Sequence, residues 1–151
     1  MLLTKDGAMR LSTRATYGMR LCFMLALAKA PLSASQLVRQ TDVGIKYLEQ
    51  LLGMLKRGEI VYAYRGKSGG YILAREPRLI TVGDMLGALD DGFDAPKCVW
   101  GVCDDVYCPN RNVLSKLNSD INKVLDSVTL LDMVNDYRNG CASFADMDIK
   151  L

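Results

Sequence analysis

Cys98, Cys103 and Cys108 lie within eleven residues, each five positions after the one before. A step of five residues turns an α-helix by about 140°, so a helix would point the three thiols in different directions. Only a loop can bring them to one centre. Three thiolates are ligands for soft metal centres, namely an iron–sulfur cluster, zinc or copper(I). The spacing therefore predicts a loop that uses its thiols for metal binding or redox chemistry.

Among these centres we expect an iron–sulfur cluster, 2Fe–2S or 4Fe–4S, bound by the three cysteines. Zinc sites usually use closer pairs such as C-x2-C, and the wider spacing here suits a larger cofactor better. The alternative is a metal-free loop, because cysteine thiolates can also be oxidised directly. The other two cysteines, Cys22 and Cys141, bring the total to an odd number, which argues against a disulfide framework.

The segment that carries the cysteines, residues 90–112, is acidic, contains Gly and Pro, and has no hydrophobic periodicity. It is predicted to be a loop, and a loop of this length in a small domain usually has a function. We therefore assign residues 90–112 as a cysteine loop that binds the cluster.

The elements before this loop predict a helix-turn-helix. Apolar residues recur every three and four positions over residues 13–30, which indicates an amphipathic helix. Ser33 then caps a short helix, a turn containing Gly44 follows, and a third helix runs over residues 45–57. Two short helices joined by a tight turn that contains Gly are typical of a helix-turn-helix.

A small β-hairpin is predicted next. Residues 60–64 and 71–73 are rich in β-branched and aromatic side chains, and the basic loop 65–70 joins them. Three of its residues are glycines, which permit a close approach to another molecule: Gly66, Gly69 and Gly70. With one more helix at 82–89, residues 9–89 form a winged helix-turn-helix domain, and the fold class is mainly α with a small β wing.

A long helix follows the cysteine loop from Val113. Its apolar residues lie on one face at three-and-four spacing, and they are Leu114, Leu117, Ile121, Val124, Leu125 and Val128. No helix of comparable length is predicted elsewhere in the chain, so pairing with a second copy would bury this face. We expect residues 113–137 to form the dimerisation helix region of a homodimer, with 138–151 as a tail. The alternative is packing against the first helix of the same chain.

The charge distribution favours a nucleic acid as the partner of the first half. Residues 1–78 hold thirteen Lys and Arg against five Asp and Glu (net +8), and residues 79–151 hold six against twelve (net −6). A basic globular half suits double-stranded DNA, because neutralising phosphates releases condensed counterions. The alternative is an ordinary solvated charged face.

The predicted DNA contacts come from the third helix and the wing. The N-terminal residues of a recognition helix face base edges in the major groove. Lys46 can reach guanine or phosphate, Glu49 can accept from cytosine N4, and Gln50 can pair with adenine. At the wing, Arg65 and Lys67 flank a glycine and are placed to enter a minor groove. Without the helix-turn-helix upstream, the wing sequence would indicate only an ordinary hairpin loop.

Other classes of protein find little support. The longest apolar run, residues 21–28, is far shorter than the roughly 20 residues that cross a bilayer, and we expect no membrane contact. Residues 1–8 do not resemble a secretion signal, so we expect a cytoplasmic protein. No pattern of paired acids or of a nucleophile with its base indicates an enzyme. A small cluster-carrying electron-transfer protein is the weakest alternative.

From residue 9 to about residue 134 the chain resembles the IscR and NsrR type of bacterial winged-helix iron–sulfur transcription regulators. Five strings and the three cysteines carry the resemblance: MRLSTRATYGMR at 9–20, KYLEQLLGMLKR at 46–57, YRGKSGGYILAR at 64–75, ITVGDMLGALD at 80–90 and TLLDMV at 129–134. The resemblance implies a homodimer whose long helices cross, with a cluster near the dimer interface. The state of the cluster, set by iron–sulfur supply, nitric oxide or oxidant, would alter affinity for an operator.

The resemblance also implies roles for particular residues. Glu49 and Gln50 match the family's base-contacting positions, Arg65 its minor-groove arginine, and the three loop cysteines its cluster ligands. We therefore expect a sequence-specific transcription regulator, most simply a repressor. The metal-free thiol-redox regulator remains the alternative.

The chain departs from the family pattern in its cysteine loop. The cysteines are spaced slightly closer, and Arg111 stands where the IscR branch has a histidine ligand; the whole chain has no histidine. The fourth ligand must be another group. Candidates are Asp104 or Asp105, a residue near Thr16 of the partner subunit, or a small thiol from solution.

Overall fold

The computed structural model describes residues 2–3, 9–66, 69–90 and 109–140 of the chain. The elements in these residues are, in chain order, β1 (Leu2–Leu3), β2 (Met9–Arg10), α1 (Thr13–Leu27), α2 (Ala34–Thr41), α3 (Ile45–Arg57), β3 (Val61–Tyr64), β4 (Gly70–Leu73), the 3-10 helix η1 (Pro77–Leu79), α4 (Val82–Ala88), α5 (Arg111–Ser127) and α6 (Leu130–Gly140). The predicted fold class, mainly α with a small β wing, is confirmed.

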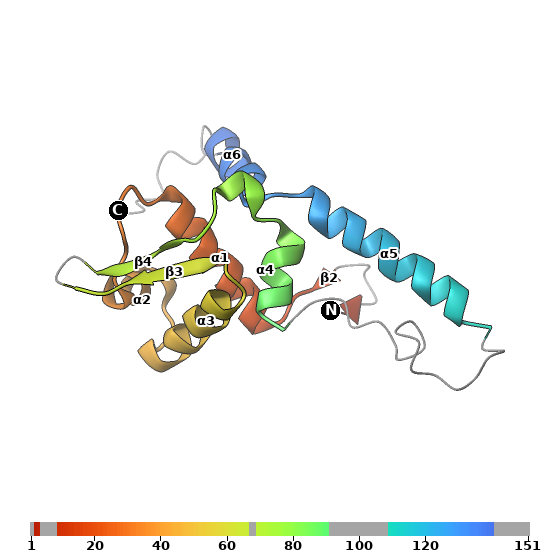
Figure 1. The fold of residues 1–151 in the computed structure, drawn as a ribbon, viewed down its shortest axis with the longest axis horizontal. Coiled ribbons are helices and arrows are strands. Elements are labelled where there is room, and N and C mark those ends of the chain that lie inside the picture. Colours follow the sequence, from red (N-terminus) through yellow and green to blue (C-terminus); the bar gives the residue numbers. More distant parts are fainter. Residues whose placement is uncertain (1, 4–8, 67–68, 91–108, 141–151) are drawn as a thin grey trace.

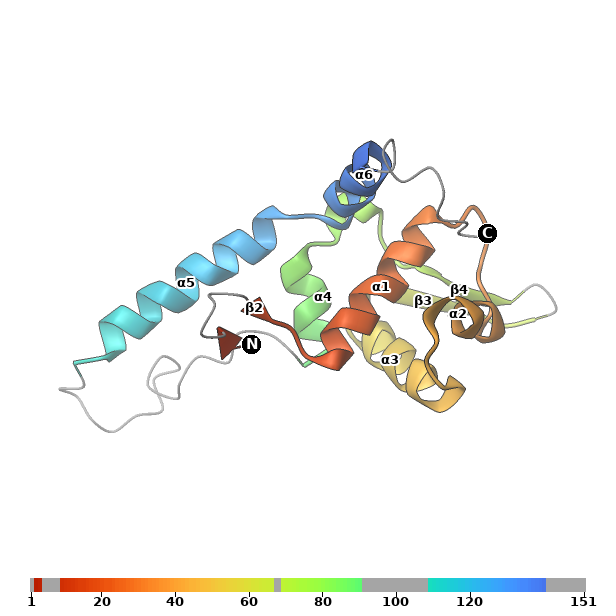
Figure 2. The same cartoon turned by 180° about the vertical axis from the view of Figure 1, so that it is seen from behind.

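Helix α1 passes through the middle of the domain, with the other elements packed around it (Figure 2). Ser12 caps its first turn by accepting a hydrogen bond from the Ala15 amide at 3.1 Å. The helix ends at Leu27, three residues before the predicted end, because Ala28 already has an extended backbone (φ −72°, ψ 135°). Proline disfavours helical backbone in the residue before it, so the helix could not have continued through Ala30 to Pro31.

The helix-turn-helix forms as predicted. Ser33 and Gln36 make a capping box at the start of α2, in which the Gln36 side chain accepts from the Ser33 amide at 2.8 Å. Asp42 adopts the left-handed conformation (φ 54°) and turns the chain toward α3. Helix α3 has the predicted bounds and buries Leu48, Leu51, Leu52, Met54 and Leu55 in the core.

The wing is an antiparallel pair in which Tyr62 lies opposite Ile72 and Tyr64 opposite Gly70. Two of its glycines are required by this chain's own backbone, and the expected approach of the wing to another molecule stays a prediction. A Cβ on Gly70 would lie 2.7 Å from the Leu32 carbonyl oxygen, and Gly66 has φ +122°, which side chains rarely permit. These glycines are therefore explained by the folding of the hairpin.

The long helical region after the cysteine loop consists of two helices. Thr129 and Asp132 form a cap that starts α6: the Asp132 carboxylate accepts from the Thr129 amide at 2.8 Å and from its hydroxyl at 2.6 Å. These hydrogen bonds lower the pKa of Asp132 below its ordinary value. Helix α6 then packs on α1 and η1, where Phe23 and Tyr137 meet edge to face at 5.0 Å between ring centroids.

Helix α5 packs mainly on α4, and its C-terminal end also joins Ala15 of α1 in a small core. Leu125, near its C-terminal end, is buried against Ala15 and Leu86. The rest of α5 extends away from the domain (Figure 1). The 113–128 face was expected to meet either a second copy or the first helix. Leu125 of this face joins α1 at Ala15, while most of the contact with α1 within this chain comes from α6.

The contact between α1 and α4 allows a stability prediction. A Cβ added to Gly18 in α1 would overlap the side chain of Leu89, which is fully buried and cannot move aside freely. We expect Gly18→Ala to destabilise the fold by about 1–2 kcal/mol net of the gain in helix propensity. Unfolding in urea, followed by circular dichroism, measures the change.

Gly53→Ala in α3 is the matched control for this substitution. Its new methyl group would meet only the Arg57 Nη1 atom at 3.8 Å. We expect it to stabilise the fold by about 0.5–1 kcal/mol, as alanine does in an open helical position. Equal changes for the two variants would contradict a tight contact between Gly18 and Leu89.

Candidate functional site

The N-terminal half of α3 presents an exposed polar face. Lys46, Glu49 and Gln50 are all exposed, and Ile45 beside them is 43% exposed. The steps of one, three and four positions between these residues place them on one side of the helix. The first turn of α3 therefore offers hydrogen-bonding side chains that the core does not use.

The opposite side of the same turn fixes the helix to the domain. Leu48 is fully buried, and the half-buried Tyr47 packs edge to face on Tyr17, with 6.5 Å between ring centroids. Both were expected in the core. One face of α3 is thus held rigidly while the other remains open to a ligand.

The N-terminus of α3 also keeps the partial positive charge of its amides uncompensated within the first turn. Gly44 is its N-cap and supplies no side-chain hydrogen bond, and no acidic residue lies in the first turn. The amides at a helix N-terminus carry a partial positive charge that attracts anions such as phosphate. Lys46 adds a full positive charge at the same end.

The outer ends of β3 and β4, Tyr64 and Gly70, lie at the same end of the molecule as α2 and α3, away from the free end of α5 (Figure 1). Arg65 is exposed and directly precedes the glycine at the turn. Lys67, the other predicted wing contact, lies outside the described residues.

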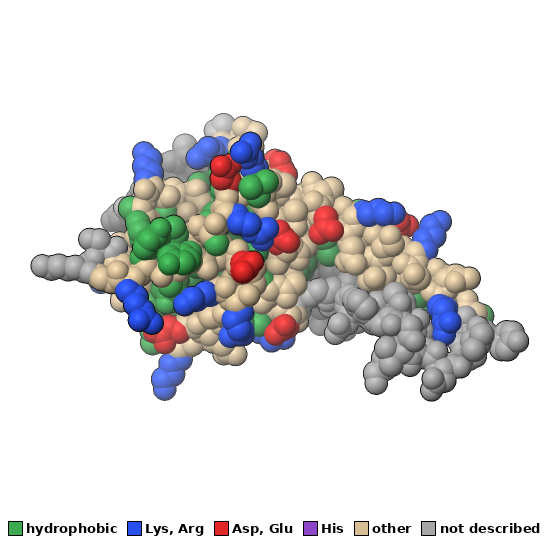
Figure 3. Space-filling view, viewed as in Figure 1, with side chains coloured by type: hydrophobic (Ala, Val, Ile, Leu, Met, Phe, Trp, Pro, Cys, Tyr) green, Lys and Arg blue, Asp and Glu red, His purple; other side chains and the backbone are tan. Residues whose placement is uncertain are grey.

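Positive side chains gather around these elements. On the face seen in Figure 3, Lys and Arg surround the wing and the helix-turn-helix. Three ion pairs occur among the described residues, and they join Arg75 to Asp84, Arg78 to Glu76, and Lys123 to Asp120. Lys46 and Arg65 take part in none of these three pairs, so both charges are available to a polyanion.

The three predicted cluster ligands, Cys98, Cys103 and Cys108, lie outside the described residues, as does Cys141. The described parts of the cysteine loop are Asp90, two residues after the end of α4, and residues 109–112, which lead into the first turn of α5. Within the described residues, no three His, Cys, Asp or Glu side chains come together as a metal site. The structure therefore shows only where the two ends of the cysteine loop lie.

Cys22 is a core residue, as expected. It is fully buried in α1, and burial raises the pKa of its thiol to about 12 from an ordinary 9.0. The native thiol therefore stays neutral, and its contribution to stability is present below pH 9 and lost as the pH rises from 9 toward 12.

We expect native Cys22 to resist alkylation. At pH 8 a pKa of about 12 lowers its thiolate fraction on the order of 1,000-fold, and burial also excludes the reagent. Iodoacetamide treatment followed by mass spectrometry of the Cys22 peptide measures this. Rapid labelling of Cys22 in the folded protein, at the rate seen in denaturant, would contradict its place in the core.

Two exposed tyrosines on the wing were not predicted to have a role. Tyr62 and Tyr64 are 52% and 51% exposed and meet edge to face at 5.0 Å between ring centroids. Their spacing of two in a predicted strand placed them on one face, but nothing local indicated that this face was the outer one.

Two helices joined by a tight turn, a basic hairpin and an open recognition-helix face define a winged helix-turn-helix DNA-binding protein. The Rrf2 family model, described as an iron-dependent transcriptional regulator, matches residues 11–136. The chain belongs to the Rrf2 family, as the resemblance to the IscR and NsrR type predicted. It is a transcription regulator and not an enzyme.

Relatives named CymR and relatives named IscR are both similar to this protein over most of the chain. CymR of Bacillus subtilis is 32% identical over 136 residues, which cover 87% of this chain and 94% of CymR. Its solved structure, titled as the global cysteine regulator, has a TM-score of 0.67 and covers 85% of this chain and 98% of its own. IscR of Sodalis glossinidius is 30% identical over 131 residues, or 84% of this chain and 79% of that protein. The T. potens IscR structure has a TM-score of 0.68 and is 34% identical, with 93% of each chain covered.

None of the described helices is both long and apolar enough to cross a bilayer.

Proposed function

We propose that this protein is a cytoplasmic, homodimeric, sequence-specific repressor whose operator affinity depends on an iron–sulfur cluster held by Cys98, Cys103 and Cys108. The observation that carries the proposal is the combination in one Rrf2 chain of an open, basic recognition surface with a loop of three thiols. DNA binding and cluster binding rest on different residues, so each can be tested alone.

For DNA binding, Lys46, Glu49 and Gln50 read base edges in the major groove. Their support is the exposure of all three on a helix whose other face is locked in the core. Such rigid support keeps the side chains in register with the base pairs. Arg65 and Lys67 extend the contact into the adjacent minor groove, where arginine is attracted by narrow A·T-rich segments.

Arg65→Ala tests the role of the wing. Loss of an arginine held in the minor groove should cost about 1–2 kcal/mol at the operator, on the order of a tenfold rise in Kd. The variant should lose less affinity for random duplex, and both values are measured by fluorescence anisotropy at fixed salt.

Arg75→Ala is the control for this experiment, because Arg75 is paired with Asp84 at 3.2 Å at the other end of the hairpin. It should leave both affinities close to those of the unmodified protein. Equal losses on operator and random duplex for Arg65→Ala would mean that Arg65 contacts phosphate only.

For dimerisation, α5 supplies a row of apolar side chains that this chain leaves uncovered. Val113, Leu117, Val124 and Val128 are 68%, 47%, 64% and 40% exposed. Their spacing of four, seven and four positions is the heptad spacing of two helices that pair along one seam. A second copy of α5 would bury this row and set two recognition helices on one operator.

For the cluster, the support is the chemistry of the donor set. Three thiols within eleven residues match the cysteine ligation of iron–sulfur centres, which supply a redox- and nitric-oxide-sensitive group when bound. The loop is anchored at α4, which packs on both α1 and α3, and at α5, which carries the proposed dimer seam. Both the recognition domain and the proposed dimer interface are therefore continuous with the loop that would bind the cluster.

The deciding experiment is anaerobic purification followed by visible absorption spectroscopy and by iron and sulfide analysis. Visible absorption with matching iron and sulfide supports the cluster. A colourless protein with stoichiometric zinc would exclude it and would leave the DNA-binding proposal untouched.

A metal-free thiol-redox regulator is the second candidate. Two observations favour it: the chain has no histidine for a fourth ligand, and it is similar to a protein titled as a global cysteine regulator. It predicts reversible oxidation of Cys103 and no iron after anaerobic reconstitution with iron and sulfide. Thiol-specific mass spectrometry on oxidised and reduced protein distinguishes the two candidates.

A further inference from the structure

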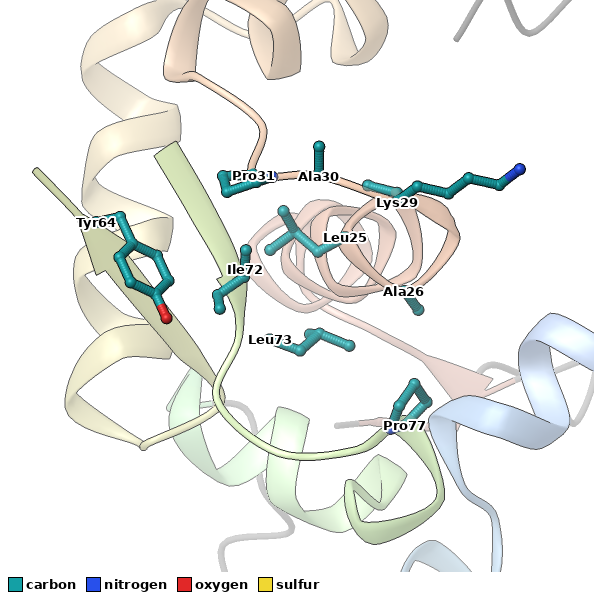
Figure 4. A pocket seen from close by; sticks show the side chains of 10 residues that line it. Leu25, Ala26, Lys29, Ala30, Pro31, Tyr64, Ile72, Leu73 and Pro77 are labelled. Carbon is teal, nitrogen blue, oxygen red and sulfur yellow. The ribbon is translucent and has the colours of Figure 1, made fainter. Parts of the chain in front are cut away.

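An apolar groove of about 440 Å³ lies beside the C-terminal end of α1. Leu25 and Ala26 of α1 form one wall, Ile72 and Leu73 of β4 form another, and Pro77 of η1 closes one end (Figure 4). All of its lining residues are apolar except Lys29 and Tyr64. A hollow of this kind suits an apolar segment of chain.

One wall of this groove is a strand edge that is paired at Tyr71 and open at Leu73. The Tyr71 amide donates to the Leu32 carbonyl at 2.8 Å and its carbonyl accepts from the Leu32 amide at 3.1 Å, so both Tyr71 groups face away from β3. The Ala74 amide donates to Ile60 at 2.9 Å on the β3 side. Backbone groups of alternate residues share an edge, so the Leu73 amide and carbonyl face the groove side. Among the described residues, none bonds to them there.

We propose that residues 141–151 of the same chain occupy this groove and that residues 147–151 add to the free edge of β4 as a further strand. The sequence of this segment has the required pattern, because Met147, Ile149 and Leu151 alternate with Asp148 and Lys150. Strict alternation suits a strand with one face on an apolar surface and the other in water. An added strand supplies hydrogen bonds to an open edge and covers apolar side chains at the same time.

The groove is within reach of the end of α6. Tyr137 of α6 packs on Phe23 of α1 at 5.0 Å, and Ala26 of the groove is one helical turn further along α1. Adding one turn of α6 from Tyr137 to Gly140 gives a separation of roughly 15–20 Å between Gly140 and the groove. The six residues 141–146 can span about 20 Å when extended, which leaves 147–151 for the strand.

The charges agree with this occupant. Lys29 is exposed where it lines the groove, and the segment carries Asp146 and Asp148 among its polar positions. Tyr64, which also lines the groove, directly precedes Arg65 at the wing tip. A docked segment would thus support the strand pair that carries the wing.

Amide hydrogen exchange at Leu73, followed by NMR on the full chain, tests the proposal. A hydrogen bond from the added strand should slow exchange at Leu73 on the order of tenfold relative to a chain that ends at Gly140. Ile149→Ser, which removes an inward side chain, should accelerate exchange at Leu73 toward the rate of the chain that ends at Gly140. Lys150→Ser is the matched control on the outward face and should leave it unchanged.

Two controls make the result decisive. The first is exchange at Leu52 in the core of α3, which reports global stability and should be equal in all variants. If truncation changes exchange at Leu52, the test rests on Ile149→Ser, because that variant keeps the whole chain. Labelled chain ending at Gly140, mixed with unlabelled full chain, shows whether a second copy donates the segment. Protection of Leu73 in that mixture, or equal exchange at Leu73 with and without residues 141–151, would overturn the proposal.

Discussion

Cys103→Ser, purified without oxygen, is expected to lose the visible absorption of the cluster together with its iron and sulfide. The substitution removes the central thiolate of the three in the cysteine loop. A serine hydroxyl is a hard and weakly acidic ligand that does not replace a thiolate at iron. Cluster occupancy should fall on the order of tenfold or more after identical reconstitution.

The functional part of this prediction concerns the response to nitric oxide. Operator affinity of the unmodified protein should change after exposure, whereas the affinity of Cys103→Ser should be the same before and after. Fluorescence anisotropy under anaerobic conditions measures both. The direction of the change in the unmodified protein then reveals whether the cluster favours or opposes DNA binding.

Cys141→Ser is the control for the cysteine loop. It removes one thiol from the chain but leaves Cys98, Cys103 and Cys108 in place. This variant should keep the visible absorption of the cluster and the change in operator affinity after exposure to nitric oxide. Retention of the cluster by Cys103→Ser, or loss of it by Cys141→Ser, would contradict the assignment of the ligands.

Val124→Asp is expected to convert the dimer into a monomer. Val124 is 64% exposed on α5, so the substitution removes little packing within the chain. In a symmetric interface it removes one apolar side chain, worth about 1.5–3 kcal/mol when buried, from each copy. The dissociation constant of the dimer should therefore rise on the order of 100- to 10,000-fold, which sedimentation velocity over a dilution series measures.

Operator binding by Val124→Asp should weaken in parallel. A monomer contacts only one half-site and loses the second set of phosphate and base contacts. The helix-turn-helix itself should remain folded, because the main contacts of α5 with the domain are with α4 and with Ala15 of α1. Circular dichroism at the concentration of the binding assay checks this point.

Asn122→Asp provides the same charge on the opposite side of α5. Asn122 is exposed and lies two positions, or about 200° of helix, from Val124. This variant should remain dimeric and bind the operator normally. A monomeric Asn122→Asp, or a dimeric Val124→Asp, would remove the apolar row of α5 from the dimer interface.

The sequence alone determined the elements of the recognition domain. The bounds of α3 agree with the predicted 45–57, the predicted Ser33 caps α2, and α4 begins at the predicted residue 82. These features depend on side chains and amides three or four residues apart, so they can be read locally. The metal-binding or redox chemistry of the three loop cysteines stays a prediction from residue type and spacing, because these residues lie outside the described ones.

The division of the C-terminal helical region was missed although a local signal was present. Thr129 and Asp132 have the spacing of a capping box, and they start α6. The apolar row continues across them without a break in period, which hid the boundary. The direction of α6 had no local signal, because the bridge between Thr81 and Thr129 and the contact between Phe23 and Tyr137 join residues far apart in the chain.

Only the tertiary structure decided which surfaces stay open. Gly70 is required because the Leu32 backbone lies against it, and the groove beside β4 exists because α1 ends at Leu27 and η1 follows the wing. On α5, Leu125 is covered by α4 while Val113 and Val124 are not. Hydrophobic periodicity identifies a face that must be buried, but contacts between distant residues determine which part of that face its own chain covers.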